Sequence, residues 1–282
     1  MMTIGLIALD LDGTLLDSQK NLSERNRRAL ERCARMGIQI VPTTGRAVDG
    51  ITREVRSLPG VNYAISTNGG TVADLARGIS LKRCTLSNAK ALEVLGIVKK
   101  YRAMYDPYID GRGISQPAFI EHMEDYGLSP VIQKMVLSTR DVVPNILHYV
   151  TDCKKDVEKV NVYLADVKDI EPLRKELSGV EGIVISSSLY NNLEINALGA
   201  TKGIALMWLA GYLGIAPEAT MAFGDGENDL SMLEAAARLC RIRKYKIYTL
   251  KELQDRVKEK LQKLKGQGAA PFMQIVSGDT LL

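Results

Sequence analysis

A run of apolar residues near the amino terminus ends on two carboxylates, Asp10 and Asp12. Residues 4–9 are apolar apart from Gly5, which is typical of a parallel strand covered on both faces. Two ionised carboxylates at the end of such a strand would repel each other and resist desolvation. A divalent cation would relieve both costs, and the pair could then supply a nucleophile and an acid or base. Asp-Gly alone is also a common turn, so the downstream motifs decide between these interpretations.

The length and composition indicate an ordinary globular protein. At 282 residues the chain exceeds the usual size of one domain, which predicts one large and one smaller domain. Four scattered cysteines without a C-x-x-C pair favour a reduced, cytoplasmic protein over a disulfide or zinc protein. No apolar run approaches the roughly 20 residues of a membrane helix, and Asp10 comes too early for a signal peptide. We therefore expect no membrane partner.

The charge is unevenly distributed. The net charge is +4, but residues 238–265 contain eleven Lys or Arg against three Asp or Glu, so the rest of the chain is acidic. A basic body that would bind nucleic acid is absent, and no nucleic-acid partner is expected. The only two histidines, His122 and His148, are expected on ordinary surfaces and leave little room for histidine-centred catalysis.

The first part of the chain alternates strands and helices. Such a rhythm predicts an α/β fold, a Rossmann-like doubly wound parallel sheet with right-handed connections. In these sheets the ligand lies at the carboxyl ends of the strands, so Asp10, Thr44 and Asn68 should point into one crevice. The expected strands are 4–10, 38–43 and 63–67, and the expected helices are 23–36 and 47–57.

The pattern of expected helices and strands changes between residues 84 and 192, and we interpret this segment as an inserted α+β domain. The core domain then comprises 1–83 and 193–282, with 193–196 returning the chain to it, followed by a helix from about 200 to 213, a strand over 220–223 and a helix from Leu230. The expected elements of the insert are helices 88–101, 117–126, 142–152 and 169–178, and strands 105–110, 134–139, 159–165 and 182–187.

Four motifs stand at the expected strand ends or helix starts, and each suits one task in phosphoryl transfer. Asp10 would attack phosphorus and form an aspartyl-phosphate, while Asp12 would protonate the leaving oxygen and then deprotonate the hydrolytic water. The hydroxyl of Thr44 and neighbouring backbone N–H groups, with Gly45 beside it, would bind phosphate oxygens. Lys202 would add a positive charge at a helix N-terminus, where the helix dipole already favours anions.

The fourth motif, residues 224–229, would complete a metal site. Mg²⁺ prefers few carboxylates and retains several waters, which matches the ligands available here. Asp229 would support the ligands from behind, and Asn228 would donate toward phosphate. The predicted cofactor is Mg²⁺, and its predicted ligands are Asp10, the backbone carbonyl of Asp12, and Asp225.

The order and spacing of these motifs resemble the haloacid dehalogenase superfamily, specifically the Cof-type phosphatases with an α/β (type II) cap between the second and third motifs. The resemblance covers residues 4–70 and 193–234 closely, and the insert by its length and texture. It implies a Rossmann-like core, a mobile cap, Mg²⁺ dependence and hydrolysis of small phosphate monoesters such as sugar phosphates. The roles given above agree with those of the family at the matching positions.

Side chains and spacing narrow the reaction within this superfamily. Asp12 argues against a dehalogenase-like enzyme, because those enzymes lack an acid at this position, and against an ion-pumping ATPase, because those carry a different residue there. Phosphomutases resemble chains that carry the cap between the first and second motifs. Here only 34 residues separate Asp10 from Thr44, which are too few for such a cap, and the 158 residues between Thr44 and Lys202 contain it instead. A hydrolase acting on a small phosphorylated metabolite is therefore predicted. A phosphate-binding or regulatory protein on the same fold, and phosphotransfer to another acceptor, remain as alternatives.

Simpler interpretations exist for single motifs. Thr44-Gly45-Arg46 could be a plain strand-to-helix turn, and Lys202 alone a solvated lysine. We favour Arg46 as a residue that pairs with an acid over one that contacts substrate. Segments 106–112 and 190–192 are polar and aromatic, as a specificity surface would be, but hairpin turns are the favoured interpretation.

The carboxyl-terminal segment 237–282 departs from the family pattern. The family usually continues with a glycine-containing apolar strand and a small Asn-Ala loop, whereas this chain has the basic run 238–246 and a charged, helix-like stretch 249–265. One hypothesis is a shifted reading frame or a cloning artefact; the other is ordinary divergence with a solvated basic face. Sequencing the gene distinguishes them, because a single in-frame reading that matches this segment would contradict the first.

Overall fold

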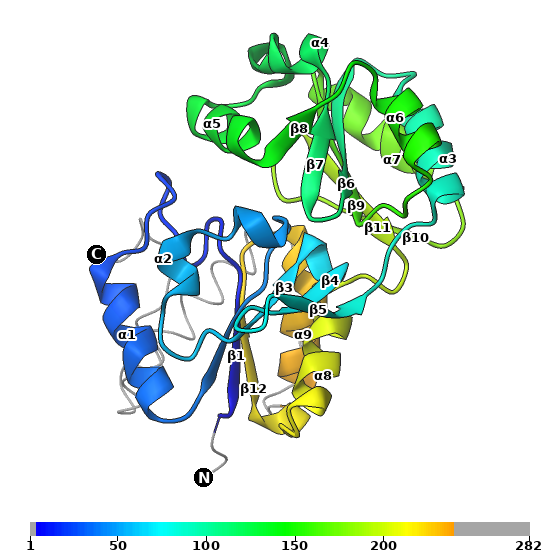
Figure 1. Cartoon of the computed structure of the whole chain (residues 1–282). Helices are drawn as coiled ribbons and strands as arrows, with labels where there is room; N and C mark the ends of the chain where they lie inside the picture. Colours follow the sequence, from blue (N-terminus) through cyan, green and yellow to red (C-terminus); the bar gives the residue numbers. More distant parts are fainter. Residues whose placement is uncertain (1–3, 240–282) are drawn as a thin grey trace.

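The computed structural model describes residues 4–239, which form two units joined by two chain segments (Figure 1). We call residues 86–197 the upper unit and the other described residues the lower unit, as they lie in Figure 1. Each unit has its own sheet and its own apolar cluster. The α/β class predicted from the alternation of strands and helices is confirmed.

The sheet of the lower unit contains parallel strands at its centre. Strands β12, β1 and β2 pair in parallel in that order. A parallel bridge between Thr43 and Ile65 places β3 next to β2, and β4 and β5 then add antiparallel strands. The strands are β12 (Thr220–Phe223), β1 (Leu6–Leu9), β2 (Gln39–Pro42), β3 (Tyr63–Ser66), β4 (Thr71–Asp74) and β5 (Ile79–Arg83).

Helices cover both faces of this sheet, which explains why β1 is apolar at every position. Ile7 and Leu9 belong to the cluster that includes α1 (Glu24–Arg35). Leu6 and Ala8 point the other way, into the cluster that includes α8 (Lys202–Tyr212) and α9 (Leu230–Leu239). The expected helix 47–57 consists of two short pieces, a 3-10 turn (Val48–Gly50) and α2 (Arg53–Arg56).

The upper unit is a six-stranded, mostly antiparallel sheet with helices α3, α6 and α7 on one face (Figure 1). Its strand order is β10-β11-β9-β6-β7-β8. Strand β9 alternates: Val160 and Val162 join the apolar cluster under these helices, while the alternate residues Lys159 and Asn161 are polar and also buried. The elements are α3 (Asn88–Val98), β6 (Ala103–Ile109), β7 (Arg112–Ser115), α4 (Pro117–Ile120), α5 (Pro130–Thr139), β8 (Arg140–Val142), α6 (Ile146–Cys153), β9 (Lys159–Leu164), α7 (Ile170–Leu177), β10 (Ile183–Ser186) and β11 (Asn192–Ala197).

Three expectations for this region are wrong. Segment 134–139 is not a strand but the second half of α5, which starts with Ser129 capping Ile132 N–H and with Pro130 in the first turn. The expected helix 142–152 begins only at Ile146, because Arg140–Val142 pairs with β7. Segment 193–196 does not return the chain to the core: it lies within β11, between β10 and β9 of the upper sheet.

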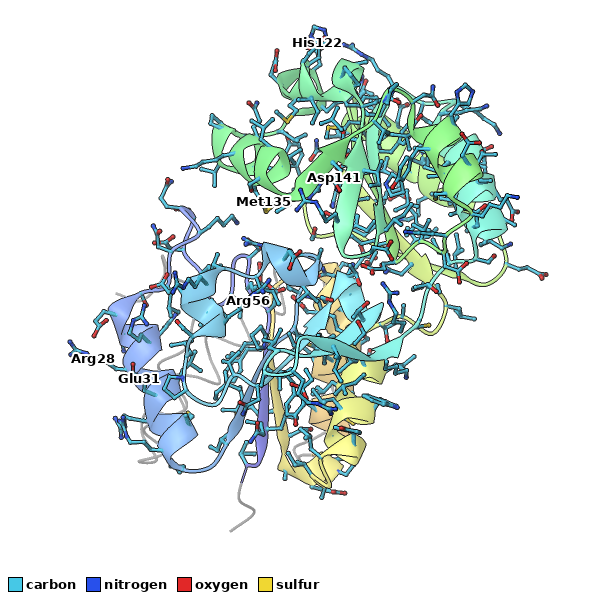
Figure 2. The ribbon with its side chains drawn as sticks, in the orientation of Figure 1. Arg28, Glu31, Arg56, His122, Met135 and Asp141 are labelled. Carbon is cyan, nitrogen blue, oxygen red and sulfur yellow. The ribbon has the colours of Figure 1, made fainter. Side chains whose placement is uncertain are left out.

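The remaining expectations concern membrane helices, cysteines, histidines and the carboxyl-terminal segment. Among residues 4–239 no helix is long and apolar enough to cross a membrane. Cys33, Cys84 and Cys153 are free thiols. The exposed His122 lies at the outer end of the upper unit (Figure 2), and His148 is exposed as well. The predictions for 240–282, including the helix-like stretch 249–265, fall outside the described residues.

Candidate active site

Asp10 follows β1 directly, and its position is set by the alternation of that strand. Its carboxylate continues the face of Leu6 and Ala8, which packs toward α8, and therefore meets the first residue of that helix. Lys202 Nζ donates to Asp10 Oδ1 at 2.7 Å and to Asp229 Oδ1 at 2.6 Å. Both Lys202 and Asp229 are almost fully buried, so this contact is shielded from water.

The charges of this cluster shift several pKa values. Burial raises the pKa of Asp10, and the charges of Asp229 and Asp12 raise it further against the opposing charge of Lys202. Burial alone would lower the pKa of Lys202, but the carboxylates of Asp10 and Asp229 outweigh it and raise that pKa. Lys202 is therefore an ammonium group at neutral pH, and it carries one positive charge against several buried carboxylates.

Asp225 lies on the loop after β12 and faces the cluster formed by Asp10, Lys202 and Asp229. Thr14 Oγ1 donates to Asp225 Oδ1 at 2.6 Å, which fixes the carboxylate against the turn after Asp10. Gly13 has φ +96°, and a Cβ there would lie 2.4 Å from Asp225 Oδ2, so glycine is needed both for the turn and for this approach. Burial and the charge of Asp229 raise the pKa of Asp225, and the Thr14 hydrogen bond opposes them.

Asp229 orients the Asp225 loop. Its Oδ2 accepts hydrogen bonds from the backbone N–H groups of Asp225 and Gly226 at 2.9 and 2.8 Å, while Oδ1 accepts from Lys202. Both carboxylate oxygens of Asp229 are thus engaged within the protein. The sequence predicted Asp229 as a supporting carboxylate behind the metal ligands, and that role stays a prediction.

Asp12 is held by cations rather than by the other carboxylates. Arg46 donates from Nε to Asp12 Oδ2 at 2.7 Å and from Nη2 to Asp12 Oδ1 at 2.6 Å. Lys20 Nζ lies 2.9 Å from Asp12 Oδ1. Burial would raise the pKa of Asp12, but the hydrogen bonds and charge of Arg46, together with Lys20, lower it to about 2. We favoured an acid as the partner of Arg46, and that acid proves to be Asp12.

Thr44, Gly45 and Asn228 also line the site. The hydroxyl of buried Thr44 accepts a hydrogen bond from Arg46 N–H at 3.1 Å and keeps its own O–H as a donor. Asn228 Nδ2 donates to Asn68 Oδ1 at 3.2 Å and to Glu194 Oε2 at 3.1 Å, so both of its N–H groups are occupied by protein oxygens. Asn68, expected in the crevice, follows β3 and contacts Asn228 but is not among the residues that line the cavity.

These residues surround a cavity of about 290 Å³ between the two units. Side chains from the upper unit that sequence analysis missed form the other wall. Met135 of α5 points down toward the lower unit (Figure 2). Residues Tyr108 and Asn192 belong to segments for which hairpin turns were favoured; the turn is confirmed at 109–112, but both side chains line the cavity. The upper wall comprises Tyr108, Ile132, Met135, Lys159, Asn161, Tyr163, Ser188, Leu189, Asn192 and Glu194.

One signal in the sequence could have identified part of this wall. In β9 and β11 every second residue is polar, and all of these polar residues are buried, which is unusual for the second face of an antiparallel sheet. A buried polar face requires partners, and here the partners are the cavity and the lower unit. The polar residues are Lys159, Asn161 and Tyr163 on β9, and Asn192, Glu194 and Asn196 on β11.

Three of the predicted residues form a group that could hold a metal ion. One carboxylate oxygen from each of Asp10, Asp225 and Asp229 lies within 4.8 Å of the others. The carboxylate of Asp12 is bound to Arg46 and Lys20 and is not in this group. Carboxylate oxygens suit a hard divalent cation, and the single ammonium of Lys202 leaves the group with excess negative charge.

A doubly wound sheet with this carboxylate group at the carboxyl ends of β1 and β12 defines a class of hydrolase. The sequence model of the haloacid dehalogenase-like hydrolase family matches residues 7–268, and the chain belongs to this family. The family predicted from the sequence motifs is thereby confirmed, and so is the prediction of a hydrolase enzyme. The match extends into the atypical segment 237–282, whose origin remains open.

Several relatives and solved structures resemble the chain over most of its length. Phosphatase YwpJ of Bacillus subtilis is 30% identical over 250 residues, which is 83% of this chain and 87% of that protein. A haloacid dehalogenase-like hydrolase from B. subtilis of known structure has a TM-score of 0.70 at 26% identity and covers 82% of this chain and 87% of its own. A sugar phosphatase of haloacid dehalogenase subclass IIB, BT4131, shares the fold, with a TM-score of 0.67, 20% identity, and coverage of 83% and 85%.

Proposed function

We propose that this protein is a Mg²⁺-dependent phosphatase that hydrolyses small phosphate monoesters by way of a phosphorylated Asp10. The observation that carries the proposal is the shared cavity, in which the carboxylate group of Asp10, Asp225 and Asp229 lies beside Asp12 and Thr44. A nucleophile, an acid or base, and a donor for phosphate oxygens are thereby brought to one point.

Mg²⁺ would be held by Asp10, Asp225 and the backbone carbonyl of Asp12. The donor set fits this ion, because it consists of oxygens and because the buried carboxylates exceed the nearby ammonium in charge. When bound, Mg²⁺ would reduce the repulsion between Asp10 and an anionic phosphate group. Asp229 would keep the Asp225 loop in place through the hydrogen bonds to its backbone.

The residues then divide the reaction into two steps. A carboxylate oxygen of Asp10 forms a bond to phosphorus, the ester P–O bond breaks, and the leaving oxygen takes a proton from Asp12. In the second step Asp12 takes a proton from water, which attacks phosphorus and releases phosphate and the Asp10 carboxylate. Arg46 and Lys20 lower the pKa of Asp12, which favours the ionised form required for the second step. The proton that Asp12 gives to the leaving oxygen in the first step would enter with the substrate, as the monoanion of the phosphate ester.

Phosphate oxygens would be bound by the lower unit, and the leaving group would lie against the upper unit. The proposed donors are Thr44 O–H, which lines the cavity, and Lys202 Nζ, which contacts Asp10, and Asn228 would join them if it released one of its present contacts. The cavity volume suits a metabolite rather than a polymer. We propose sugar phosphates or related metabolites as substrates, and a cytoplasmic location.

The decisive experiment is release of inorganic phosphate from a panel of monoesters. The panel would include p-nitrophenyl phosphate, hexose and pentose phosphates, pyridoxal phosphate, flavin mononucleotide, and the phosphorylated ribitylaminouracil named for the relative YcsE of B. subtilis, which is 26% identical. Release that requires Mg²⁺ and is lost in Asp10→Asn would support the proposal. Folded wild-type protein that binds phosphate but releases none would support the binding-protein alternative, and transfer to added alcohols would indicate a phosphotransferase.

The metal site has a test that does not depend on activity. Mg²⁺ should raise the melting temperature of the wild-type protein, and Asp225→Asn should abolish most of that increase, because it removes a charged ligand. Asp74→Asn is a matched control, since Asp74 is a buried aspartate at the end of β4 whose side chain accepts from Arg77 N–H. An equal response in wild type and Asp225→Asn would contradict the assignment of this ligand.

A further inference from the structure

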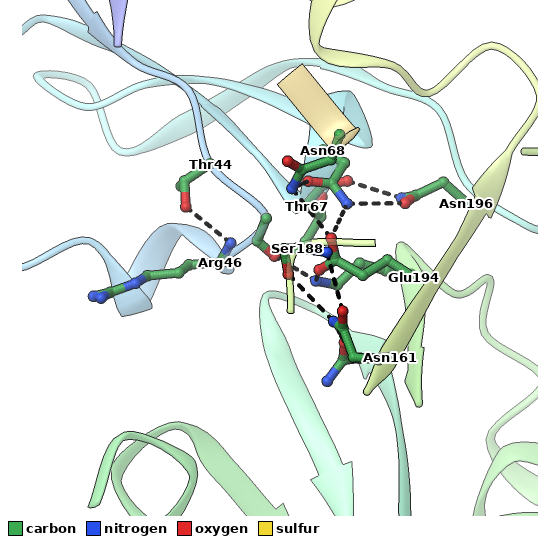
Figure 3. A network of polar contacts seen from close by, with 12 residues as sticks. Thr44, Arg46, Thr67, Asn68, Asn161, Ser188, Glu194 and Asn196 are labelled. Atoms are coloured by element: carbon green, nitrogen blue, oxygen red, sulfur yellow. Dashed lines mark hydrogen bonds and ion pairs between the residues drawn. The ribbon is translucent and has the colours of Figure 1, made fainter. Parts of the chain in front are cut away.

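Glu194 and Lys159 form a buried ion pair on the face of the upper sheet that is turned toward the lower unit. Figure 3 shows Glu194 close to Asn68 of the lower unit. Lys159 Nζ lies 2.6 Å from Glu194 Oε1, and both side chains are at most 4% exposed. Lys159 Nζ also donates to the carbonyl oxygen of Gly45 in the lower unit at 2.7 Å. The second oxygen, Glu194 Oε2, accepts from Asn68 and from Asn228, each at 3.1 Å.

The lower unit is shaped to admit this pair. A Cβ at Gly45 would lie 2.9 Å from Glu194 Oε1, 2.9 Å from Asn68 Oδ1 and 3.4 Å from Lys159 Nζ. Glu194 Oε1 and Lys159 Nζ are hydrogen-bonded to each other, and Asn68 Oδ1 accepts from Asn228. Because all three atoms are buried, none of them can move away without losing a partner. Glycine at position 45 therefore serves the contact between the units in addition to the turn after Thr44.

The segment that presents Asn68 adopts an unfavourable backbone conformation. Thr67 has φ +48° and Asn68 has φ +58°, both in the left-handed region, which is costly for a β-branched residue. The same segment is bound by β11, since Asn196 Nδ2 donates to the carbonyl oxygen of Thr67 at 2.8 Å (Figure 3). Contacts with the upper unit thus help to keep this loop in the conformation that directs Asn68 to Glu194.

The ion pair itself can survive separation of the units. Both members belong to the upper sheet, so separation would expose the pair to water without breaking it. A buried pair adds little net stability compared with apolar residues of similar size, and its most secure contribution is to specify one arrangement. The contacts of the ion pair that separation would break are those to Gly45, Asn68 and Asn228, which lie at the proposed phosphate-binding end of the site.

We infer that Glu194 is a positioning residue: with Lys159, it holds Asn68, Asn228 and the Gly45 carbonyl, and through them the Thr44 turn that we propose binds phosphate, only when the upper unit is seated on the lower one. The inference rests on the proposed function. It assigns to β11 and β9 a part in binding the phosphate group, in addition to any contact they make with the leaving group.

The first test measures how tightly the proposed phosphate subsite binds substrate and inorganic phosphate. Glu194→Gln removes the charge, and Glu194→Asp keeps the charge but shortens the reach by one methylene. Both variants should raise KM for p-nitrophenyl phosphate and the inhibition constant of inorganic phosphate by about tenfold or more, the loss expected when a hydrogen bond to a charged group is removed. The value of kcat should change much less. Loss of folded protein alone would lower kcat and leave KM unchanged.

The matched control is Asp106→Asn. Asp106 forms the other fully buried ion pair of this sheet, with Arg140 at 3.1 Å, and among the described residues the hydrogen bonds of that pair stay within the upper unit. This variant should be destabilised without a rise in KM or in the phosphate inhibition constant. Equal rises in Asp106→Asn, or unchanged values in both Glu194 variants, would overturn the inference.

A second readout does not depend on catalysis. The N–H groups of Thr67 and Asn68 donate to the carbonyl oxygens of Arg46 and Thr44 at 2.8 and 3.0 Å, so their hydrogen exchange reports on the order of this region. Exchange in a peptide covering 66–70 should be about tenfold faster in Glu194→Gln than in wild type or Asp106→Asn, with β1 unchanged. If wild type lacks phosphatase activity but exchange responds in this way, only the proposed function fails; unchanged exchange contradicts the inference itself.

Discussion

Arg46 holds both carboxylate oxygens of Asp12 through two hydrogen bonds of 2.7 and 2.6 Å. The same arginine donates from Nη1 to the carbonyl oxygen of Gly50, so its guanidinium is fixed on two sides. Asp12 is thereby directed into the cavity as an anion, with Lys20 as a second cationic neighbour. Asp12, the residue proposed to transfer protons, is therefore oriented by Arg46, although the motif that contains Arg46 could by itself have been a simple turn.

Arg46→Ala should lower kcat/KM by roughly 100-fold, because a misplaced proton-transfer group can cost about that factor. Arg46→Lys keeps the charge but cannot contact both oxygens at once, and should recover only part of the loss. Steady-state kinetics on the best substrate of the panel would measure both. Arg28→Ala, which breaks an exposed pair with Glu24 on α1, should leave kinetics unchanged. Full activity in Arg46→Ala would contradict this role.

Lys202→Met should destabilise the protein by about 3–5 kcal/mol in the presence of a chelator, because it leaves the buried carboxylates of Asp10 and Asp229 without their cation. Mg²⁺ should restore part of this loss, since it supplies positive charge to the same group. Urea unfolding of the variant and of wild type, each with chelator or with Mg²⁺, measures both effects. A loss of the same size with and without Mg²⁺ would show that the ion does not bind near Lys202.

Gly45→Ala should destabilise the contact between the units and weaken phosphate binding, because its Cβ would lie 2.9 Å from Glu194 Oε1 and Asn68 Oδ1. We expect a loss of about 1–3 kcal/mol in the free energy of unfolding, typical of an overpacked site. Gly96→Ala in α3 is the matched control: its Cβ would meet nothing within 4 Å, and alanine favours helix by about 0.5–1 kcal/mol. Chemical denaturation compares the two, and equal stability would refute the steric argument.

Glu194 predicts a specific dependence of stability on pH. Burial would raise its pKa, but the charge and hydrogen bond of Lys159, together with Asn68, lower the pKa below the ordinary value of 4.5. A lowered pKa contributes stability that is present above 4.5 and is lost as the pH falls through the folded-state value. The difference in unfolding free energy between wild type and Glu194→Gln should thus be constant from pH 7 to pH 5 and shrink at lower pH. A difference that grows on acidification would contradict the lowered pKa.

Much of the lower unit could be predicted because its signals are local. An apolar strand covered on both faces shows itself as a continuous apolar run, and the carboxyl ends of parallel strands meet at one edge. Asp10, Thr44 and Asp225 therefore had to converge once the alternation of strands and helices was recognised, and the structure brings them to one cavity. Lys202 followed from its place at the start of α8.

The upper unit could be predicted less well because its signals compete. Segment 134–139 contains the β-branched residues Val136 and Thr139, which favour strands, yet Ser129 and Pro130 start a helix that runs through it. The strand 192–197 reads equally well as part of either sheet, and only its pairing with β9 and β10 decides. Local sequence does not contain that pairing, because each partner strand is an independent segment with its own register.

The sequence by itself determined the family and the parallel core, and it predicted the carboxylates, lysine and threonine of the proposed reaction site, since strand ends and helix starts place these groups through short-range geometry. Tertiary structure decided which partners they have. Arg46 reaches Asp12 across 34 positions, Lys159 reaches Gly45 across 114, and Asn228 reaches Asn68 across 160. These contacts depend on which loops the packing brings together, within the lower unit for Arg46 and Asn228 and between the two units for Lys159, and a buried charge takes whichever partner that packing brings within hydrogen-bond distance.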